Sequence, residues 1–239
     1  MKSSSLGLVA LVTFGLLGPA QGQSPATGDP RPTPPSSTSQ PARQGPAGWF
    51  RLDASVGIFP IAGRMKYSFV YRDVVLDNKS GTPRPSPAVS LSAAAQRRWF
   101  FLGFSLQLTT LKWIYTEGGT GGYDGRGYEV DFLPRIGLAL PLISSLRLLL
   151  SGAPGYSIVD VSGMTLGAYT RPSTLQGFVV QGDVGLLFFF TRRGFAQAGA
   201  STQWGFQNDT VTSKTSNQAA TAELRTLLFG FHVGVGYWF

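Results

Sequence analysis

The last eleven residues, FGFHVGVGYWF (residues 229–239), decide the fold class because large apolar and small side chains alternate along them. Every second position is aromatic or aliphatic: Phe229, Phe231, Val233, Val235, Tyr237 and Phe239. The positions between them hold three glycines, His232 and Trp238. A period of two predicts a β-strand. Its small face would have to point to a crowded or wet interior, whereas most soluble sheets bury their apolar face.

The composition excludes several classes of protein. The chain has 239 residues, of which 43% are hydrophobic and 13% charged, and its 31 glycines and 17 phenylalanines favour strands and tight turns over helices. The mean hydropathy of +0.07 is low for a bundle of membrane helices, each of which needs about 20 apolar residues in a row. The absence of cysteine excludes disulfides, thiolate metal sites and cysteine nucleophiles.

The first 48 residues predict two segments outside the folded domain. Lys2 precedes the apolar run LGLVALVTFGLLGPA, and small residues stand at the spacing of a cleavage site, so residues 1–22 predict a secretory signal peptide. An uncleaved anchor helix is the alternative. Residues 23–48 are rich in Pro, Ser and Thr and predict a disordered linker, with a partner-binding role as the alternative. The folded domain then covers residues 49–239.

Seven further segments of this domain repeat the alternation of the last strand. They span residues 49–59, 88–96, 100–110, 128–140, 146–158, 176–190 and 195–206, and the last strand begins near residue 223. In the first segment Phe50, Leu52 and Val56 share one face, while Arg51 and Asp53 share the other. The total of eight strands is even, as expected of a bacterial transmembrane barrel.

The connections between these strands alternate in length. Three are short: Arg97 and Arg98, PLISS (residues 141–145) and TRRG (residues 191–194). The other four are long, around residues 60–87, 112–127, 159–175 and 207–222. This pattern predicts an all-β fold, an eight-stranded antiparallel up-and-down transmembrane barrel with short periplasmic turns and long extracellular loops. The linker and the C-terminus then lie on the periplasmic side.

Aromatic residues gather at both ends of the predicted strands. At the short-turn end we expect Trp49, Trp99, Phe100, Phe190, Phe195, Trp238 and Phe239. At the long-loop end we expect Phe59, Trp113, Tyr115, Tyr128, Tyr156, Trp204 and Phe206. The two belts are about 10 residues apart along each strand, which matches the length of a tilted strand that crosses a bilayer. The last strand is therefore expected to face lipid.

With these features the chain resembles the small eight-stranded outer-membrane barrels of the OmpA/OmpX type over residues 49–239. The resemblance implies the outer membrane of a Gram-negative bacterium, and we expect a monomer. It also implies that the C-terminal residues act as the signal for the barrel-assembly machinery, namely Phe231, Val233, Val235, Tyr237 and Phe239. A soluble barrel of the lipocalin type is the alternative, but two aromatic belts would have no purpose there.

Charged residues occupy the inward positions of several predicted strands. We expect a polar network in the lumen, formed by Arg51, Asp53, Glu129, Asp131, Arg135, Arg147, Asp183 and His232. Four glutamines at positions 107, 181, 197 and 203 share these faces. Side chains fill an eight-stranded barrel, and an isolated buried charge costs several kcal/mol, so we expect paired groups rather than a wide pore.

Nothing in the sequence predicts an enzyme, a metal site or a cofactor. His232 is the only histidine, and Val233 and Gly234 follow it, whereas lipid-hydrolysing barrels typically have a serine two residues after the histidine. The glycine-rich stretch at residues 118–127 lacks the strand and helix that a phosphate-binding loop needs.

The net charge of +8 bears on partners. Basic residues concentrate in the first long connection: Arg64, Lys66, Arg72, Lys79 and Arg84. We expect contact with outer-membrane lipids, with lipopolysaccharide as a candidate partner, since basic groups contribute about 1 kcal/mol each near an anionic surface. Ordinary solvated loop charges are the alternative. Nucleic-acid binding is not expected, because no folded element has a basic face.

Two prolines mark a weak point in the predicted wall. Pro134 and Pro154 lie on the lipid-facing side of neighbouring strands, within about two positions of each other across the pair, and neither can donate a ladder hydrogen bond. We expect a bulge or a lateral gap there. The sequence thus predicts a barrel with a side-chain-filled lumen and a structural or surface-interaction role. A narrow channel or lateral conduit for small or hydrophobic molecules is the first alternative, and a lipid-modifying enzyme is the second.

Overall fold

The computed structural model describes residues 49–72, 74–116, 122–161, 174–212 and 219–239, so the expected signal peptide and linker lie outside the described residues. These residues form strands β1 (Phe50–Tyr71), β2 (Val74–Pro83), β3 (Pro87–Arg97), β4 (Phe100–Thr116), β5 (Gly122–Ile143), β6 (Leu146–Asp160), β7 (Thr174–Phe189), β8 (Gly194–Thr212) and β9 (Ala219–Trp238). Among them no helix is long and apolar enough to cross a membrane.

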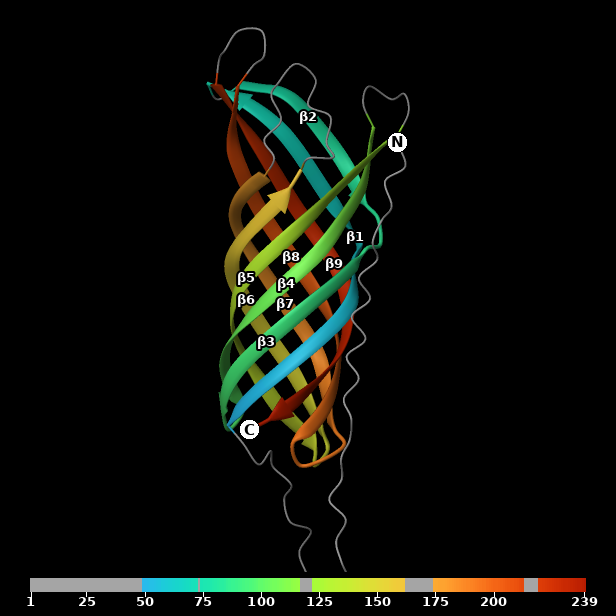
Figure 1. Cartoon of the computed structure of the whole chain (residues 1–239), viewed down its shortest axis with the longest axis vertical. Coiled ribbons are helices and arrows are strands. Elements are labelled where there is room, and N and C mark those ends of the chain that lie inside the picture. Colours follow the sequence, from blue (N-terminus) through green and yellow to red (C-terminus); the bar gives the residue numbers. More distant parts are fainter. Residues whose placement is uncertain (1–48, 73, 117–121, 162–173, 213–218) are drawn as a thin grey trace, which may run out of the picture. The chain divides into compact units, whose positions relative to one another are not determined.

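The strands form one antiparallel sheet that closes on itself. Neighbours in the sheet are neighbours in the chain from β3 to β9, and β9 pairs with β1 from Arg51↔Trp238 to Val70↔Thr221. Figure 1 shows the strands running obliquely around the barrel, with the C-terminus at the end where the short turns lie. The predicted antiparallel up-and-down barrel is confirmed.

The barrel has eight strand positions because β2 and β3 share one. Both segments lie between β1 and β4, with β3 beside the first half of β1 and β2 beside its second half. The residues between them, Arg84 to Ser86, stay attached: the Phe59 amide donates to the Ser86 carbonyl at 2.7 Å, and the Arg84 amide donates to the Lys112 carbonyl at 2.7 Å.

The strands extend further towards the long-loop end than the sequence predicts. The prediction of a loop over residues 60–87 is wrong, because β1 continues to Tyr71 and β2 begins at Val74. Strands β4, β5, β8 and β9 likewise run into the regions expected as the second and fourth long connections. The physical reason is an apolar cluster inside this part of the barrel, which includes Met65, Tyr67 and Leu224. Burial of these side chains favours strand where Gly, Asp and Pro indicated loop.

The two faces of each strand are as predicted. Outward positions are exposed and apolar, for example Leu91, Phe231 and Val233, of which Phe231 is 62% exposed. Inward positions hold small, polar or tightly packed groups. Gly137 faces Phe101 across β4 and β5, and a β-carbon at residue 137 would come within 2.5 Å of the Phe101 ring. Large inward aromatics therefore require glycine beside them.

The aromatic belts are only partly as expected. Exposed aromatic side chains at the turn end are Trp49, Trp99, Phe100, Phe190 and Phe239, and those towards the loop end are Tyr128, Tyr156, Trp204 and Phe206. The placement of Phe59, Trp113, Phe195 and Trp238 in the belts is wrong, because all four are buried inside the barrel. They occupy inward positions, where they fill the two ends of the lumen. The side chain of Tyr115 lies outside the described residues.

Candidate functional site

The interior of the barrel is built in layers. An apolar cluster fills the loop end, including Phe59, Trp113 and Leu224. A second apolar cluster fills the turn end, including Phe101, Phe195 and Trp238. The predicted polar side chains lie between them, with the exceptions of Arg147, at the turn end of β6, and Arg51, which pairs across the sheet with Trp238 of the second cluster.

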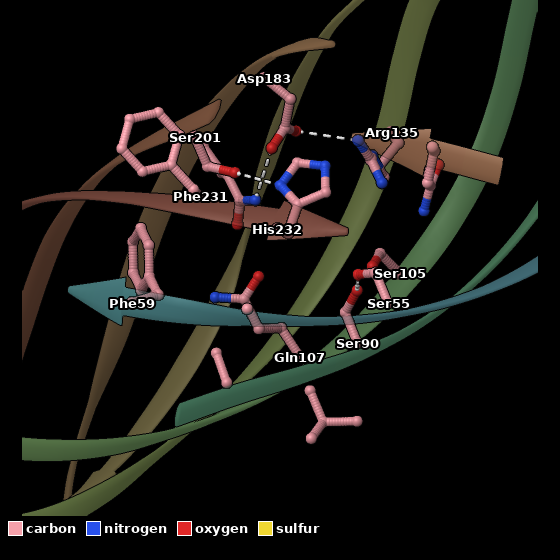
Figure 2. Close-up of a pocket in the computed structure, with 15 residues that line it drawn as sticks. Ser55, Phe59, Ser90, Ser105, Gln107, Arg135, Asp183, Ser201, Phe231 and His232 are labelled. Atoms are coloured by element: carbon pink, nitrogen blue, oxygen red, sulfur yellow. Dashed lines mark hydrogen bonds and ion pairs between the residues drawn. The ribbon is translucent and has the colours of Figure 1, made fainter. Parts of the chain in front are cut away.

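Arg135 and Asp183 form the centre of this polar layer. The Arg135 guanidinium donates to a carboxylate oxygen of Asp183 at 2.9 Å and to the Ser151 hydroxyl at 2.9 Å. The other Asp183 oxygen accepts a hydrogen bond from Gln181 at 2.9 Å. Figure 2 shows Ser201 and Arg135 on opposite sides of Asp183, with His232 below Asp183 and between them. The ion pair thus joins β5 to β7, and Ser151 of β6 hydrogen-bonds to it.

Arg51 and Asp53 form a second pair nearer the turn end. The Arg51 Nε atom lies 3.5 Å from the Asp53 carboxylate, and both side chains are buried. Asp53 also accepts a hydrogen bond from Gln197 at 3.0 Å, and the Arg51 guanidinium stacks over the Phe101 ring at 4.5 Å. The inward period of β1 and β4 brings these groups together, since Arg51 and Phe101 lie on strands that flank β3.

Glu129 and Asp131 form a third group. Both are fully buried, and the Gln203 amide donates to Glu129 at 2.8 Å and to Asp131 at 3.3 Å. The Ser157 hydroxyl also donates to Glu129, at 2.9 Å. Among the described residues no basic side chain contacts either carboxylate. The predicted single network is therefore arranged as separate clusters, of which this one is held by amides and a hydroxyl.

His232 makes one polar contact. Its Nδ1 atom lies 3.1 Å from the Ser201 hydroxyl, and Asp183 is nearby (Figure 2). A catalytic triad needs the histidine between the serine and the carboxylate. Here the strongest contact of Asp183 is with Arg135 instead. The residue types of a triad are present without its order of contacts.

The interior cavity beside these groups is small. It has a volume of about 30 Å³ and is lined by Ser55, Gln107, Arg135, Ser201 and His232, among others. This is room for about two water molecules. Among the described residues, apolar clusters lie at both ends of the barrel interior.

The hydrogen-bond ladder between β5 and β6 is interrupted at the two prolines. Pairing runs from Tyr128↔Asp160 to Phe132↔Tyr156 and resumes at Ile136↔Gly152. The register is the same on both sides, which places Pro134 directly opposite Pro154, and the only register shift in this pair lies at residues 141–143. The interruption thus inserts no extra residue. On the inner side Leu133, Ala153 and Val179 form a buried cluster behind it.

A notch lies beside this interruption on the outer surface. It has a volume of about 620 Å³ and lies over Gly152 and Gly182, which are cross-strand partners. Its rim includes Ile136, Leu150 and Phe229. A β-carbon at residue 152 would meet nothing within 4 Å, so this glycine leaves open space on the face that is otherwise covered by large apolar side chains.

Exposed basic side chains form a row on the outer surface near the loop end. We define the outer basic row as Arg64, Lys66, Lys112, Arg126 and Arg225, all of which are exposed. Lys66 lies directly opposite Arg225, and Lys112 lies directly opposite Arg126. The row lies level with the exposed aromatics or just beyond them, since Phe206 pairs with Arg225 and Tyr128 follows Arg126 by two residues.

Solved structures show which proteins share this architecture. The outer membrane protein OprG from Pseudomonas aeruginosa aligns with a TM-score of 0.60 over 81% of this chain and 97% of that chain, at 9% identity. The outer membrane protein AlkL aligns with a TM-score of 0.50 over 89% of this chain and 97% of that chain, at 11% identity. The fold is that of the small outer-membrane β-barrels. No protein-family model and no curated protein matches the sequence.

Sequence reasoning missed most of the outer basic row. It noted Arg64 and Lys66 as loop charges, but the structure places them on β1. It did not single out Lys112, Arg126 or Arg225. The available signal was that these residues occupy outward positions of the alternating pattern. The sequence analysis ended the strands before or near these positions, so the pattern was not followed that far.

Proposed function

We propose that this protein is an outer-membrane barrel with a closed lumen that functions through its surface, by binding the phosphate groups of lipopolysaccharide along the outer basic row. The observation that carries this proposal is the direct opposition of two basic pairs, Lys66 with Arg225 and Lys112 with Arg126. The closed lumen, with its cavity of about 30 Å³, supports a surface role over an axial pore.

Opposed like charges need a counterion. Like charges directly opposite each other on neighbouring strands destabilise the sheet. Glu223 partly offsets one pair, because it lies 3.1 Å from Arg225 in an exposed ion pair. A phosphate between two basic side chains would offset the repulsion more fully, since hydrogen bonds between charged partners are about twice as strong as neutral ones. The neighbouring aromatic side chains would place these cations at headgroup depth.

Lipopolysaccharide binding tests the proposal. In Lys66→Gln/Lys112→Gln/Arg126→Gln/Arg225→Gln we expect added lipopolysaccharide to raise the midpoint of thermal unfolding much less than in the unchanged protein. Arg192→Gln/Arg193→Gln, in the turn between β7 and β8, is the control and should behave as the unchanged protein does. Equal stabilisation of all three proteins would contradict the proposal, as would equal stabilisation by dephosphorylated lipopolysaccharide.

Planar-bilayer conductance tests the closed lumen. The unchanged protein should show no stable openings. Phe101→Gly/Leu187→Gly/Trp238→Gly removes large side chains of the cluster at the turn end and provides the comparison, because it should raise the frequency of openings. Stable openings of the unchanged protein would favour the alternative of a narrow channel.

A lateral conduit for hydrophobic molecules is the second candidate function. It is favoured by the interrupted ladder at Pro134 and Pro154 and by the adjacent notch of about 620 Å³. Passage would require displacement of Leu133 and Ala153, which close the inner side. Because the chain has no cysteine, Pro134→Cys/Pro154→Cys can form a single disulfide across the interruption. If the conduit operates, uptake of a fluorescent alkane analogue should fall when this disulfide forms and recover on reduction.

The contacts of the residues that could form a catalytic triad argue against an enzyme. Ser201, His232 and Asp183 lack the order of contacts that activates a serine nucleophile, and the cavity beside them is too small for a lipid substrate. We propose a non-enzymatic role. Exchange of His232 for Asn would leave phospholipase and lipid A acyl-transfer assays at the same background as the unchanged protein.

A further inference from the structure

The turn end of the barrel holds a basic pocket that the proposed function does not use. It has a volume of about 670 Å³. Its lining includes Trp49, Arg97, Arg98, Trp99 and Arg147, with the buried Trp238 beside them. We call this the turn-end pocket. It lies at the opposite end of the strands from the outer basic row.

Arg147 is the feature that points to an anion. The residue is only 9% exposed, and its guanidinium lies 5.2 Å from the centre of the Phe189 ring. Among the described residues it makes no ion pair and no hydrogen bond, in contrast to Arg135 with Asp183. The guanidinium nitrogens of Arg147 open onto the turn-end pocket, where a bound anion would supply the partner that this cation lacks among the described residues.

Arg97 at the end of β3 and Arg98 in the turn that follows add two more cations to the same pocket. Arg98 has a φ of 57°, in the left-handed region that asparagine and glycine adopt at lower cost in two-residue hairpin turns. The Gln96 side-chain amide donates to the Arg98 carbonyl at 2.8 Å and supports this turn. The three short turns, residues 98–99, 144–145 and 190–193, contain no acidic residue that could neutralise the arginines.

The rim of the pocket fits a lipid better than a soluble anion. Trp49 and Trp99 are 74% and 60% exposed, and Leu142 and Ile143 at the end of β5 are exposed as well. Indole rings favour the boundary between headgroups and acyl chains. An anion in this pocket therefore lies beside apolar side chains that an acyl chain can contact.

We infer that the turn-end pocket binds the phosphate of a glycerophospholipid headgroup. Arg97, Arg98 and Arg147 supply charge-assisted hydrogen bonds to the phosphate oxygens, for which the planar guanidinium is well suited. Trp49 and Trp99 contact the glycerol and the first methylenes of the acyl chains. The bound lipid compensates Arg147 and anchors this end of the barrel in its leaflet.

Native mass spectrometry of the full chain in phosphate-free maltoside micelles tests the inference. Dioleoyl phosphatidylglycerol should bind the unchanged protein, and Arg97→Gln/Arg98→Asn/Arg147→Gln should weaken that binding by about tenfold or more. The asparagine keeps the left-handed turn. Arg192→Gln/Arg193→Gln removes two turn charges outside the pocket and should keep the affinity of the unchanged protein. Arg97→Gln/Arg98→Asn leaves Arg147 in place and should also weaken binding, so the test remains if the triple variant does not fold.

Two further ligands separate the sources of the anion. Dioleoylglycerol, which lacks the phosphate, should bind no better to the unchanged protein than to the triple variant. Inorganic phosphate should compete with the lipid only at far higher concentration. Equal lipid binding by the unchanged protein and both pocket variants would overturn the inference, and phosphate that binds as tightly as the lipid would overturn the assignment to a lipid. Lipopolysaccharide binding should be unchanged in these variants, because the outer basic row lies at the opposite end of the strands.

Discussion

At the scale of single residues, the interior is stabilised by pairs of groups that cannot be separated without cost. Arg135 contacts Asp183 and Ser151, and Asp183 is bound in turn by Gln181. The Asp183 side chain is 2% exposed and that of Arg135 is 11% exposed. Removal of one partner leaves an uncompensated charge inside the barrel, whereas an exposed ion pair contributes little.

We expect Arg135→Ala to lower the free energy of unfolding by about 3–5 kcal/mol, because Asp183 would remain buried without its counterion. Urea unfolding in lipid vesicles, followed by tryptophan fluorescence, measures this loss. Arg225→Ala is the matched control, since it breaks the exposed pair with Glu223 and should cost about 1 kcal/mol or less. Similar losses of unfolding free energy in the two variants would show that the buried pair contributes no more to stability than the exposed pair does.

At the scale of strands, β9 closes the barrel by pairing with both β8 and β1. Its end is attached by specific contacts of Phe239, whose amide donates to the Phe50 carbonyl at 2.8 Å. The Phe239 ring lies 6.2 Å from the Phe50 ring and 5.2 Å from the Tyr237 ring. The residues proposed as the assembly signal, Phe231, Val233, Val235, Tyr237 and Phe239, are all exposed on the outer face of the barrel.

Deletion of Phe239, or Phe239→Asp, should reduce the amount of membrane-inserted barrel in cells several-fold. The physical reason is the loss of the terminal pairing with Phe50 together with the last residue of the proposed signal. Phe190→Asp is the control, because Phe190 is an equally exposed aromatic residue at the same end, outside β9. The quantity to compare is heat-modifiable barrel on gels of outer-membrane fractions. Normal amounts after deletion of Phe239 would contradict the proposed signal.

At the scale of the whole molecule, the described pairings that close the barrel lie within residues 49–239. The closing pairs between β1 and β9 begin at Arg51↔Trp238, and the Gln96 amide donates to the Trp49 carbonyl at 2.6 Å. Every ladder of the described sheet is formed within residues 49–239. Stability of the barrel should therefore be independent of the segment expected as a linker.

Deletion of residues 23–48, with residues 1–22 kept, should leave insertion and the midpoint of thermal unfolding unchanged, because the ladders of the described sheet all lie within residues 49–239. Circular dichroism of the purified barrel and the heat-modifiability assay check this. A fall in the unfolding midpoint by several degrees would show instead that the segment packs on the barrel.

The sequence by itself determined the fold class, the inward and outward faces and the positions of the short turns. These follow from local rules: a period of two assigns alternate side chains to opposite faces, and short polar connections can only join antiparallel neighbours. The same rule places Arg51, Asp53 and Asp183 inward, because their positions follow from the phase of their strands. The outer face of β9 was predicted for the same reason.

Only the tertiary structure decided the lengths of the strands and what meets across the barrel. Strand β2 forms because it pairs with both β1 and β4, and its Gly and Asp residues alone indicate a loop. Trp113 and Trp238 fill the lumen because closure places their inward positions against distant strands. Register places Pro134 opposite Pro154 and Lys66 opposite Arg225, and among the described residues it leaves Arg147 without a carboxylate. A shift of one residue in register moves every side chain to the other face, so these partners are fixed by closure of the whole sheet.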